Sequence, residues 1–455
     1  MKKSLAGLVG LALISIGVRL PSPNVPATGS TDKFIIYVAG KGLTGSTYSD
    51  AKCDKADQQL SACAMARGVH AAYMSDQFKK FTSFVEYREA DDHGSLQEAK
   101  ALARRLGADA RVLAVIGHSY SETTGQAALE YAADKIPLLI PIATSPNVGY
   151  TSSSAFWTPG TGTKVHLQNV FRLIPNDRIG QAPSVAHVVT KLRASEPLSD
   201  AILVDLSDNK QYTQGLQKEL RQKLPDAEMG EISENCKDES SLPQSCFEWD
   251  GKTTSPQLIV FVGTGKSANR FLQLAILQRN ASFTGLKYIL MTDGAKNVAP
   301  LTLQQLIPTG IPLLLTFPTK QLSVDRDLRP EFITLKDALP QNGAQSYEEY
   351  GFDSLILISK ALEPLLTSKE PISRGTLIDE LNQIDAMHGA TNLLIFHDGE
   401  NVHPDYGIYG AGADQQLEAL KQTMCEARHF APATDHPTQG LRYLCYVGFD
   451  EVNLR

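Results

Sequence analysis

Residues 112–144, VLAVIGHSYSETTGQAALEYAADKIPLLIPIAT, contain two strand-like runs on either side of one helix-like stretch. The first run, VLAVIG (112–117), is continuously apolar and ends at a glycine, and the second, PLLIPIAT (137–144), ends in a hydroxyl-rich turn. Between them, ETTGQAALEYAADK (122–135) is amphipathic. Apolar strands that alternate with helices predict a parallel sheet covered by helices on both faces.

The same alternation continues along the chain. Further strand-like runs are KFIIYVAG (33–40), AILVDLS (201–207), QLIVFVG (257–263), KYILMTD (287–293) and IPLLLTF (311–317), and further helix-like stretches are SLQEAKALARRLGA (95–108), QYTQGLQKELRQKL (211–224) and SANRFLQLAILQRN (267–280). In 95–108, Leu96, Leu102 and Leu106 share one face at helical spacing. A chain of 455 residues exceeds what one core usually serves, so we predict two three-layer α/β lobes.

Composition narrows the classes of function. Hydrophobic residues make up 42% and charged residues 20% of the chain, which is ordinary for a globular protein. A net charge of −7 without a basic stripe argues against nucleic acid as a partner. Lys2 and Lys3 precede an apolar run from Leu5 to Val18, so residues 1–30 are expected to be a signal peptide or an N-terminal anchor. We therefore expect a periplasmic or extracellular protein.

The cysteines agree with export. An even number of cysteines in an exported chain favours disulfide bonds, and a metal site would need closer Cys/His spacing. The six cysteines fall into three local pairs within polar segments: Cys53 with Cys63, Cys236 with Cys246, and Cys425 with Cys445. We predict that neighbours pair, although the sequence alone also permits other connectivities.

The chemistry of the chain gathers at strand ends, where parallel sheets bind their ligands. Ser121 and its neighbouring hydroxyls follow the strand at 112–117 and open a helix, and Thr144 closes the next strand. Hydroxyls and free N–H groups at a helix N-terminus suit a carboxylate. The alternative is that Ser121 or Thr123 only caps its own helix. Two such turns on consecutive strands favour a shared anion site.

Three residues follow strands of the second half of the chain. Tyr212 comes after the strand at 201–207 and could stack on a ligand, or be an ordinary half-buried tyrosine. Asp293 ends the strand at 287–293 and could hold an ammonium group, although Asp-Gly is also a common turn. Thr264 lies in the loop Gly263-Thr-Gly-Lys266 and is expected at the same ligand.

Taken in order, these segments resemble the leucine/isoleucine/valine-binding branch of the type I periplasmic binding proteins. The resemblance spans roughly residues 33–400, is most specific from Ala114 to Asp177, and rests on the segments VIGHSYSETT, IPLLIPIATSPN, VFRLIPND, QYTQGL, LKYILMTDGA, YEEYGFDSLILISKAL and LLIFHDGE. It implies two lobes joined by three crossovers, which close by a hinge motion on a ligand in the cleft.

The resemblance also implies roles for individual residues. Ser121 and Thr144, with the backbone around Ile142 and Ala143, would hold an amino-acid carboxylate. Tyr212 would close over the ligand, and Asp293 would pair with its ammonium group. The chain departs from the family at Lys266, where aromatic residues are common, which suggests a ligand other than a branched aliphatic amino acid.

The predicted lobe boundaries are 31–175 plus 316–390 for the first lobe and 176–315 plus 391–455 for the second. The resemblance implies a monomer that captures an amino acid or amide and delivers it to an ABC permease in the membrane, without catalysis, metal or cofactor. The same fold also serves ligand sensors and proteins that contact other envelope proteins, and the sequence leaves that alternative open.

Two enzyme-like patterns compete with this interpretation. The segment Gly117-His-Ser119-Tyr-Ser121 approaches the G-x-S-x-G nucleophile elbow, so a secreted esterase with Ser119 as nucleophile and His397 or His403 as base is one alternative. Ser121 occupies the position of the motif's second glycine, and this mismatch weakens the esterase alternative. The segment from Gly263 to Ala268 fits G-x-G-x-x-A, a weak signal for a dinucleotide.

Overall fold

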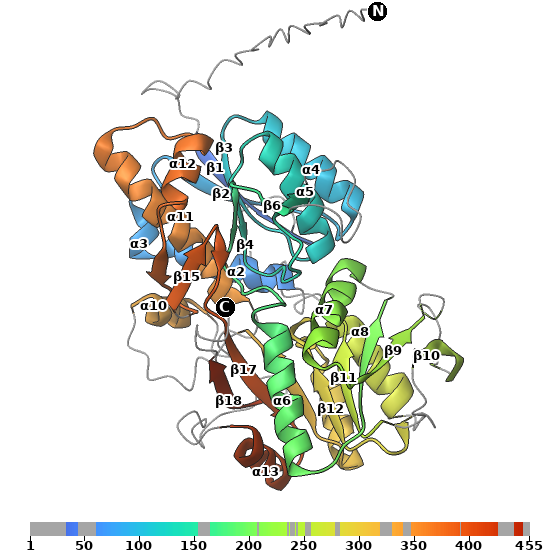
Figure 1. Ribbon diagram of the computed structural model, residues 1–455. Coiled ribbons are helices and arrows are strands. Elements are labelled where there is room, and N and C mark those ends of the chain that lie inside the picture. Colours follow the sequence, from blue (N-terminus) through green and yellow to red (C-terminus); the bar gives the residue numbers. More distant parts are fainter. Residues whose placement is uncertain are drawn as a thin grey trace, which may run out of the picture.

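The computed structural model describes residues 33–43, 61–152, 164–206, 209–233, 236, 242, 244–250, 256–277, 283–318, 330–339, 347–391, 393–425 and 441–448. These residues form two α/β lobes, each built around one eight-stranded sheet (Figure 1). The two-lobed α/β architecture predicted from the sequence is confirmed. The expected signal segment, residues 1–30, lies outside the described part of the chain.

The first sheet carries the N-terminal half of the fold. Its strands, in spatial order, are β14 (Ala386–His388), β15 (Leu393–His397), β16 (Glu400–Asn401), β7 (Val170–Arg172), β4 (Leu138–Ile140), β3 (Val112–Gly117), β1 (Phe34–Ala39) and β2 (Val85–Ala90). Helices α4 (Leu96–Ala108) and α5 (Ser121–Ala133) share a core with one face of this sheet. Helices α2 (Ser61–Met74), α11 (Glu348–Ser368) and α12 (Arg374–Leu381) pack against the other face.

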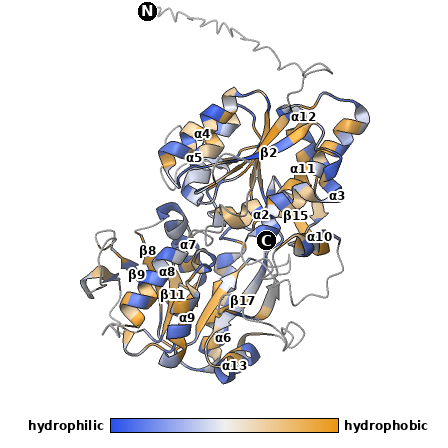
Figure 2. Ribbon diagram, turned by 180° about the vertical axis from the view of Figure 1, so that it is seen from behind, coloured by the Kyte–Doolittle hydropathy of each residue, from blue (hydrophilic) through white to orange (hydrophobic). Residues whose placement is uncertain are grey.

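The second sheet follows the same plan. Its strands, in spatial order, are β10 (Phe247–Trp249), β9 (Glu228–Ile232), β8 (Asp200–Asp205), β11 (Leu258–Val262), β12 (Tyr288–Met291), β13 (Leu313–Phe317), β17 (Asp405–Ala411) and β18 (Arg442–Gly448). Helices α6 (Gln181–Ser195), α7 (Lys210–Lys223) and α13 (Asp414–Met424) share the core of one face. Helices α8 (Gly265–Phe271) and α9 (Pro300–Leu306) cover the other. Figure 2 shows strands such as β11 in hydrophobic colours inside the lobe.

Smaller elements complete the structure. They are α3 (Asp76–Lys79), the paired strands β5 (Tyr150–Ser152) and β6 (Lys164–His166), α10 (Pro330–Ala338) and the short turn of helix η5 (Asp293–Ala295). No helix among the described residues is long and apolar enough to cross a membrane.

Two glycines allow α2 and α11 to cross closely. A Cβ atom at Gly68 would lie 1.9 Å from the carbonyl oxygen of Glu348, and one at Gly351 would lie 2.2 Å from that of Met65. Any larger residue at either position would therefore push the helices apart. Ser61, the first residue of α2, and Tyr347, which precedes α11, line the same cavity.

The sheets differ from the expectation of purely parallel strands. The strands named in the sequence pair in parallel, but β14 with β15, β15 with β16, β13 with β17, β17 with β18 and β9 with β10 are antiparallel. Strands β14, β15 and β16 follow one another along the chain without an intervening helix. Such short connections can only join antiparallel strands.

The lobe boundaries also differ from the predicted ones. Strands β14 to β16, up to Asn401, belong to the first sheet, whereas the sequence prediction moved the chain into the second lobe at residue 391. Strand β13 continues in the second sheet to Phe317. The chain passes between the sheets three times: after β7, between β13 and α11, and between β16 and β17.

Disulfide bonds join Cys236 to Cys246 and Cys425 to Cys445, as expected from their spacing. Cys63 is also disulfide-bonded. Its expected partner, Cys53, lies outside the described residues. The bond between Cys425 and Cys445 joins the end of α13 to the edge strand β18, so it fastens the C-terminal segment to the second lobe.

Candidate functional site

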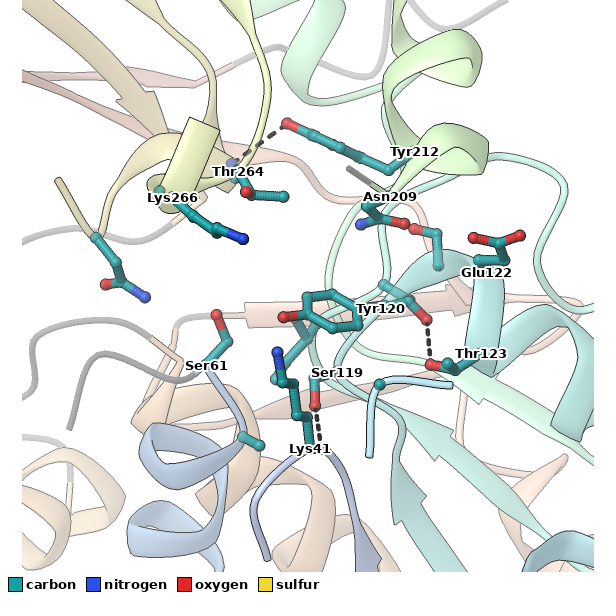
Figure 3. A pocket seen from close by; sticks show the side chains of 18 of the residues that line it. Lys41, Ser61, Ser119, Tyr120, Glu122, Thr123, Asn209, Tyr212, Thr264 and Lys266 are labelled. Carbon is teal, nitrogen blue, oxygen red and sulfur yellow. Dashed lines mark hydrogen bonds between the residues drawn. The ribbon is translucent and has the colours of Figure 1, made fainter. Parts of the chain in front are cut away.

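A cavity of about 660 Å³ lies between the lobes, where loops after strands of both sheets meet. The first lobe contributes the loop after β1, the start of α5 and the turn after β4, and the second contributes the residues after β8, β11 and β12. All seven ligand-binding candidates from the sequence line this cavity: Ser121, Ile142, Ala143, Thr144, Tyr212, Thr264 and Asp293. Figure 3 shows side chains from both lobes pointing into it.

The first lobe presents hydrogen-bond donors. Helix α5 begins at Ser121, and the residue that precedes the helix, Tyr120, makes no side-chain cap. The first N–H groups of α5 are therefore free to face the cavity. The Ser121 hydroxyl accepts a hydrogen bond from the Ser145 amide (3.3 Å), so its own proton is available to a ligand. The Thr123 hydroxyl instead donates to the Tyr120 carbonyl (3.0 Å), so it does not cap the helix as the sequence alternative had it.

A buried arginine fixes the turn that carries Ile142 to Thr144. Arg172 of β7 is fully buried, and its guanidinium donates to the carbonyls of Ala143 (3.2 Å), Ser145 (2.8 Å) and Val148. Its Nε pairs with Glu400 of β16 at 3.0 Å. Because the carbonyls of the turn are held from behind, its donors are directed to the cavity side. The sequence placed Arg172 in a family motif but did not reveal this role.

The second lobe presents a buried acid. Asp293 is 3% exposed, and burial raises the pKa of its carboxyl to about 6, opposed by a hydrogen bond from Tyr212. The Tyr212 hydroxyl donates to Asp293 Oδ1 at 2.7 Å and is 2.9 Å from the Thr292 hydroxyl. Tyr212 is itself 3% exposed. In this structure it therefore orients Asp293, besides lining the cavity.

A second buried acid lies close to the first. Asp177, after β7, is fully buried, and burial raises the pKa of its carboxyl well above the usual value, with a further contribution from the charge of Asp293. A hydrogen bond from the Thr144 side chain and the charge of Arg172 oppose this rise in pKa. When both acids are ionised, their negative charge is only partly compensated. A cation placed beside Asp293 would stabilise both.

Thr264 and the glycines near it have a structural role as well. Thr264 precedes α8, and its amide donates to the Ser267 hydroxyl at 2.9 Å. A Cβ atom at Gly263 would lie 2.4 Å from that hydroxyl, and one at Gly265 would lie 2.9 Å from the Asn297 carbonyl. Close packing thus accounts for the glycine pattern without a dinucleotide.

The structure does not assemble the esterase triad. His118 is fully buried, and its ring nitrogens contact Asp92 (2.6 Å) and Tyr131 (3.2 Å). Ser119 accepts a hydrogen bond from the Lys41 amide (3.2 Å). Neither His397 nor His403 lines the cavity, and no described residue of the cavity wall is a histidine. Among the described residues, no cluster of His, Cys, Asp and Glu could hold a metal ion.

Several cavity residues were not predicted as ligand contacts. They include Lys41, Ser61, Asn209, Arg270, Asn297 and Tyr347. Most of them follow strands whose ends were recognised, but their side chains have no sequence signature of their own.

Comparisons with known proteins identify the fold. No protein-family model and no curated protein matches the sequence. Among solved structures, a leucine-binding protein from Thermotoga maritima is similar, at 15% identity over 92% of this chain and 99% of that chain, with a TM-score of 0.62. The fold is therefore that of the type I periplasmic binding proteins.

Other solved structures have a similar fold. A branched-chain amino acid transporter substrate-binding protein from Streptococcus pneumoniae, in complex with isoleucine, is 17% identical over 84% of this chain and 96% of that chain (TM-score 0.57). A solute-binding protein from R. palustris, in complex with 4-hydroxybenzoate, is 13% identical over 92% and 97% (TM-score 0.59). At these identities the similarity concerns the fold.

Proposed function

We propose that the protein is an exported solute-binding protein that captures a small zwitterionic ligand, of the amino-acid or amide type, between its lobes. One observation carries the proposal. The donors at Ser121 and the 142–144 turn face, across one cavity, a buried carboxylate that a cation would stabilise. An α-carboxylate and an α-ammonium group need these two environments. The similar solved structures of a leucine-binding protein and of a substrate-binding protein in complex with isoleucine support the same interpretation.

In this mechanism the carboxylate docks on the first lobe. The free N–H groups of α5, the Ser121 hydroxyl and the Thr144 hydroxyl receive it. The ammonium group then reaches Asp293, which Tyr212 holds in place, and the lobes close by rotation at the three crossovers. An ABC permease is the membrane partner that this role requires, and a monomer suffices for it.

A thermal-shift screen of the mature protein tests the proposal. The panel contains amino acids, amides, urea, short peptides and benzoates. A ligand at a thousand times its Kd stabilises the protein by about 4 kcal/mol, and this stabilisation produces a large rise in Tm.

We expect Asp293→Asn to weaken binding by roughly thirtyfold and Thr144→Ala by about tenfold, because each removes a hydrogen-bonding or charged partner of the ligand.

Exposed positions supply matched controls. Asp379 on α12 and Thr190 on α6 are exposed, so Asp379→Asn and Thr190→Ala should leave the Tm shift unchanged. A panel without any hit, from a protein that melts cooperatively, would contradict the proposal. It would favour the alternative in which this fold contacts another envelope protein.

A further inference from the structure

Three cations at the cavity have no role in binding a simple zwitterion. Lys41 comes from the loop after β1 in the first lobe, and Lys266 and Arg270 come from α8 in the second. Figure 3 shows the side chains of Lys41 and Lys266 reaching into the cavity from opposite sides. Against these three, the described cavity wall offers only two acids, Glu122 and Asp293. The cavity is thus more basic than the protein, whose net charge is −7.

Arg270 has hydrogen-bond donors that the described part of the protein does not pair. Its Nε and Nη2 atoms are buried and have no hydrogen-bond partner among the described residues. A buried guanidinium donor without a partner costs free energy that an acceptor would recover. Lys266 and Arg270 are four residues apart on α8, so they lie on the same side of that helix. Both side chains line the cavity.

These cations act at a different place from the acid that would bind the ammonium group. The pKa of Asp293 is set by burial, by Tyr212 and by backbone N–H groups, and none of the three cations contributes to it. They also come from different elements than the donors at Ser121 and Thr144, which suit the α-carboxylate. The cavity therefore has three polar regions, whereas a neutral aliphatic side chain would need an apolar third region.

Resting on the function proposed above, we propose that the ligand carries a second anionic group, which Lys41, Lys266 and Arg270 bind. The chemical class is an α-amino acid with a carboxylate side chain. Since Lys41 belongs to one lobe and the other two cations to the other, the side-chain carboxylate would bridge the lobes. Without an anion, the like charges repel across the cleft and favour the open form.

Isothermal titration calorimetry of the mature chain tests this with L-glutamate and L-aspartate against their neutral counterparts L-glutamine and L-asparagine, and against L-leucine. We expect the acids to bind at least about tenfold more tightly than the amides, because charge-assisted hydrogen bonds are stronger than neutral ones. Lys266→Gln and Arg270→Gln should each weaken binding of the acid by about tenfold and change amide binding by less than about threefold.

The control is Lys223→Gln, at an exposed position on α7, which should change neither affinity. Arg270→Gln should not lower the Tm of the ligand-free protein, because it removes buried donors that lack a partner. A large fall in that Tm would instead indicate that Arg270 stabilises the fold. The test of the anionic subsite would then rest on Lys266→Gln, because Lys266 is exposed.

The outcomes separate the two proposals. Tight binding of leucine or glutamine that depends on Asp293 but not on Lys266 would overturn the anionic subsite and leave the solute-binding function standing. Equal losses for acids and amides in Lys266→Gln would also overturn it. No binding of any compound would overturn both proposals.

Discussion

At the scale of single residues, the cavity contains charges that the folded protein tolerates at a cost. Asp293 is buried, no cation among the described residues forms an ion pair with it, and its pKa is raised to about 6 from a usual value of 3.8. A raised carboxyl pKa means that the folded state holds its proton more tightly than the unfolded state. Stability is therefore lost as pH rises from about 4 to above 6. The ligand's ammonium group would remove this cost.

The corresponding prediction concerns Asp293→Asn in the absence of ligand. At pH 7 the variant should be more stable by up to about 3 kcal/mol, because it removes the buried charge and keeps an acceptor for Tyr212. Below the usual pKa of 3.8 the wild-type carboxyl is protonated in both states, so the difference should vanish. Chemical denaturation at several pH values measures this. A variant less stable than wild type at pH 7 would contradict it.

At the scale of elements, the donors of the site depend on how the turn after β4 is held. Arg172 satisfies three carbonyls of that turn and pairs with Glu400, so β7 and β16 support the turn from behind. Glu400 belongs to the C-terminal return of the chain into the first sheet. The geometry of the first-lobe donors is therefore linked to a segment far away in the sequence.

We predict that Arg172→Met destabilises the protein by about 3–5 kcal/mol, because it removes the guanidinium that pairs with Glu400 and that donates to several buried carbonyls. Denaturant unfolding measures the effect. Arg178→Met is the control, since the Arg178–Glu219 pair at 3.2 Å involves an arginine side chain that is 57% exposed and should contribute less than about 1 kcal/mol. Equal unfolding midpoints for the two variants would show that Arg172 does not hold the turn.

At the scale of the whole molecule, buried charges also lie where the lobes meet. Lys296 follows η5 in the second lobe, and its Nζ lies 3.9 Å from the ring centre of Phe317. Burial lowers the pKa of Lys296 to about 8, and the charges of Glu349 and Glu348, on α11 of the first lobe, oppose this shift. Burial raises the pKa of Glu349 to about 8. The two lobes are thus coupled electrostatically.

A double-mutant cycle tests this coupling. Lys296→Met should cost less stability in the Glu349→Gln background than in the wild-type background, with an interaction of about 1–3 kcal/mol. The reason is that the first substitution leaves a buried acid without its cation, and the second removes that acid. Thermal unfolding of the four proteins measures the cycle. Additive losses would show that Lys296 and Glu349 do not interact across the lobes.

The local sequence determined the alternation of strands and helices and the polar turns at strand ends, because both depend on residues that are near one another in the chain. It therefore placed the seven predicted residues, including Thr144 and Asp293, at strand ends, and these seven line the cavity. The tertiary structure alone decided which residues meet across the cleft. Lys41 and Arg270 converge only because of the crossovers, and the pKa of Asp293 and the support from Arg172 depend on burial by distant segments.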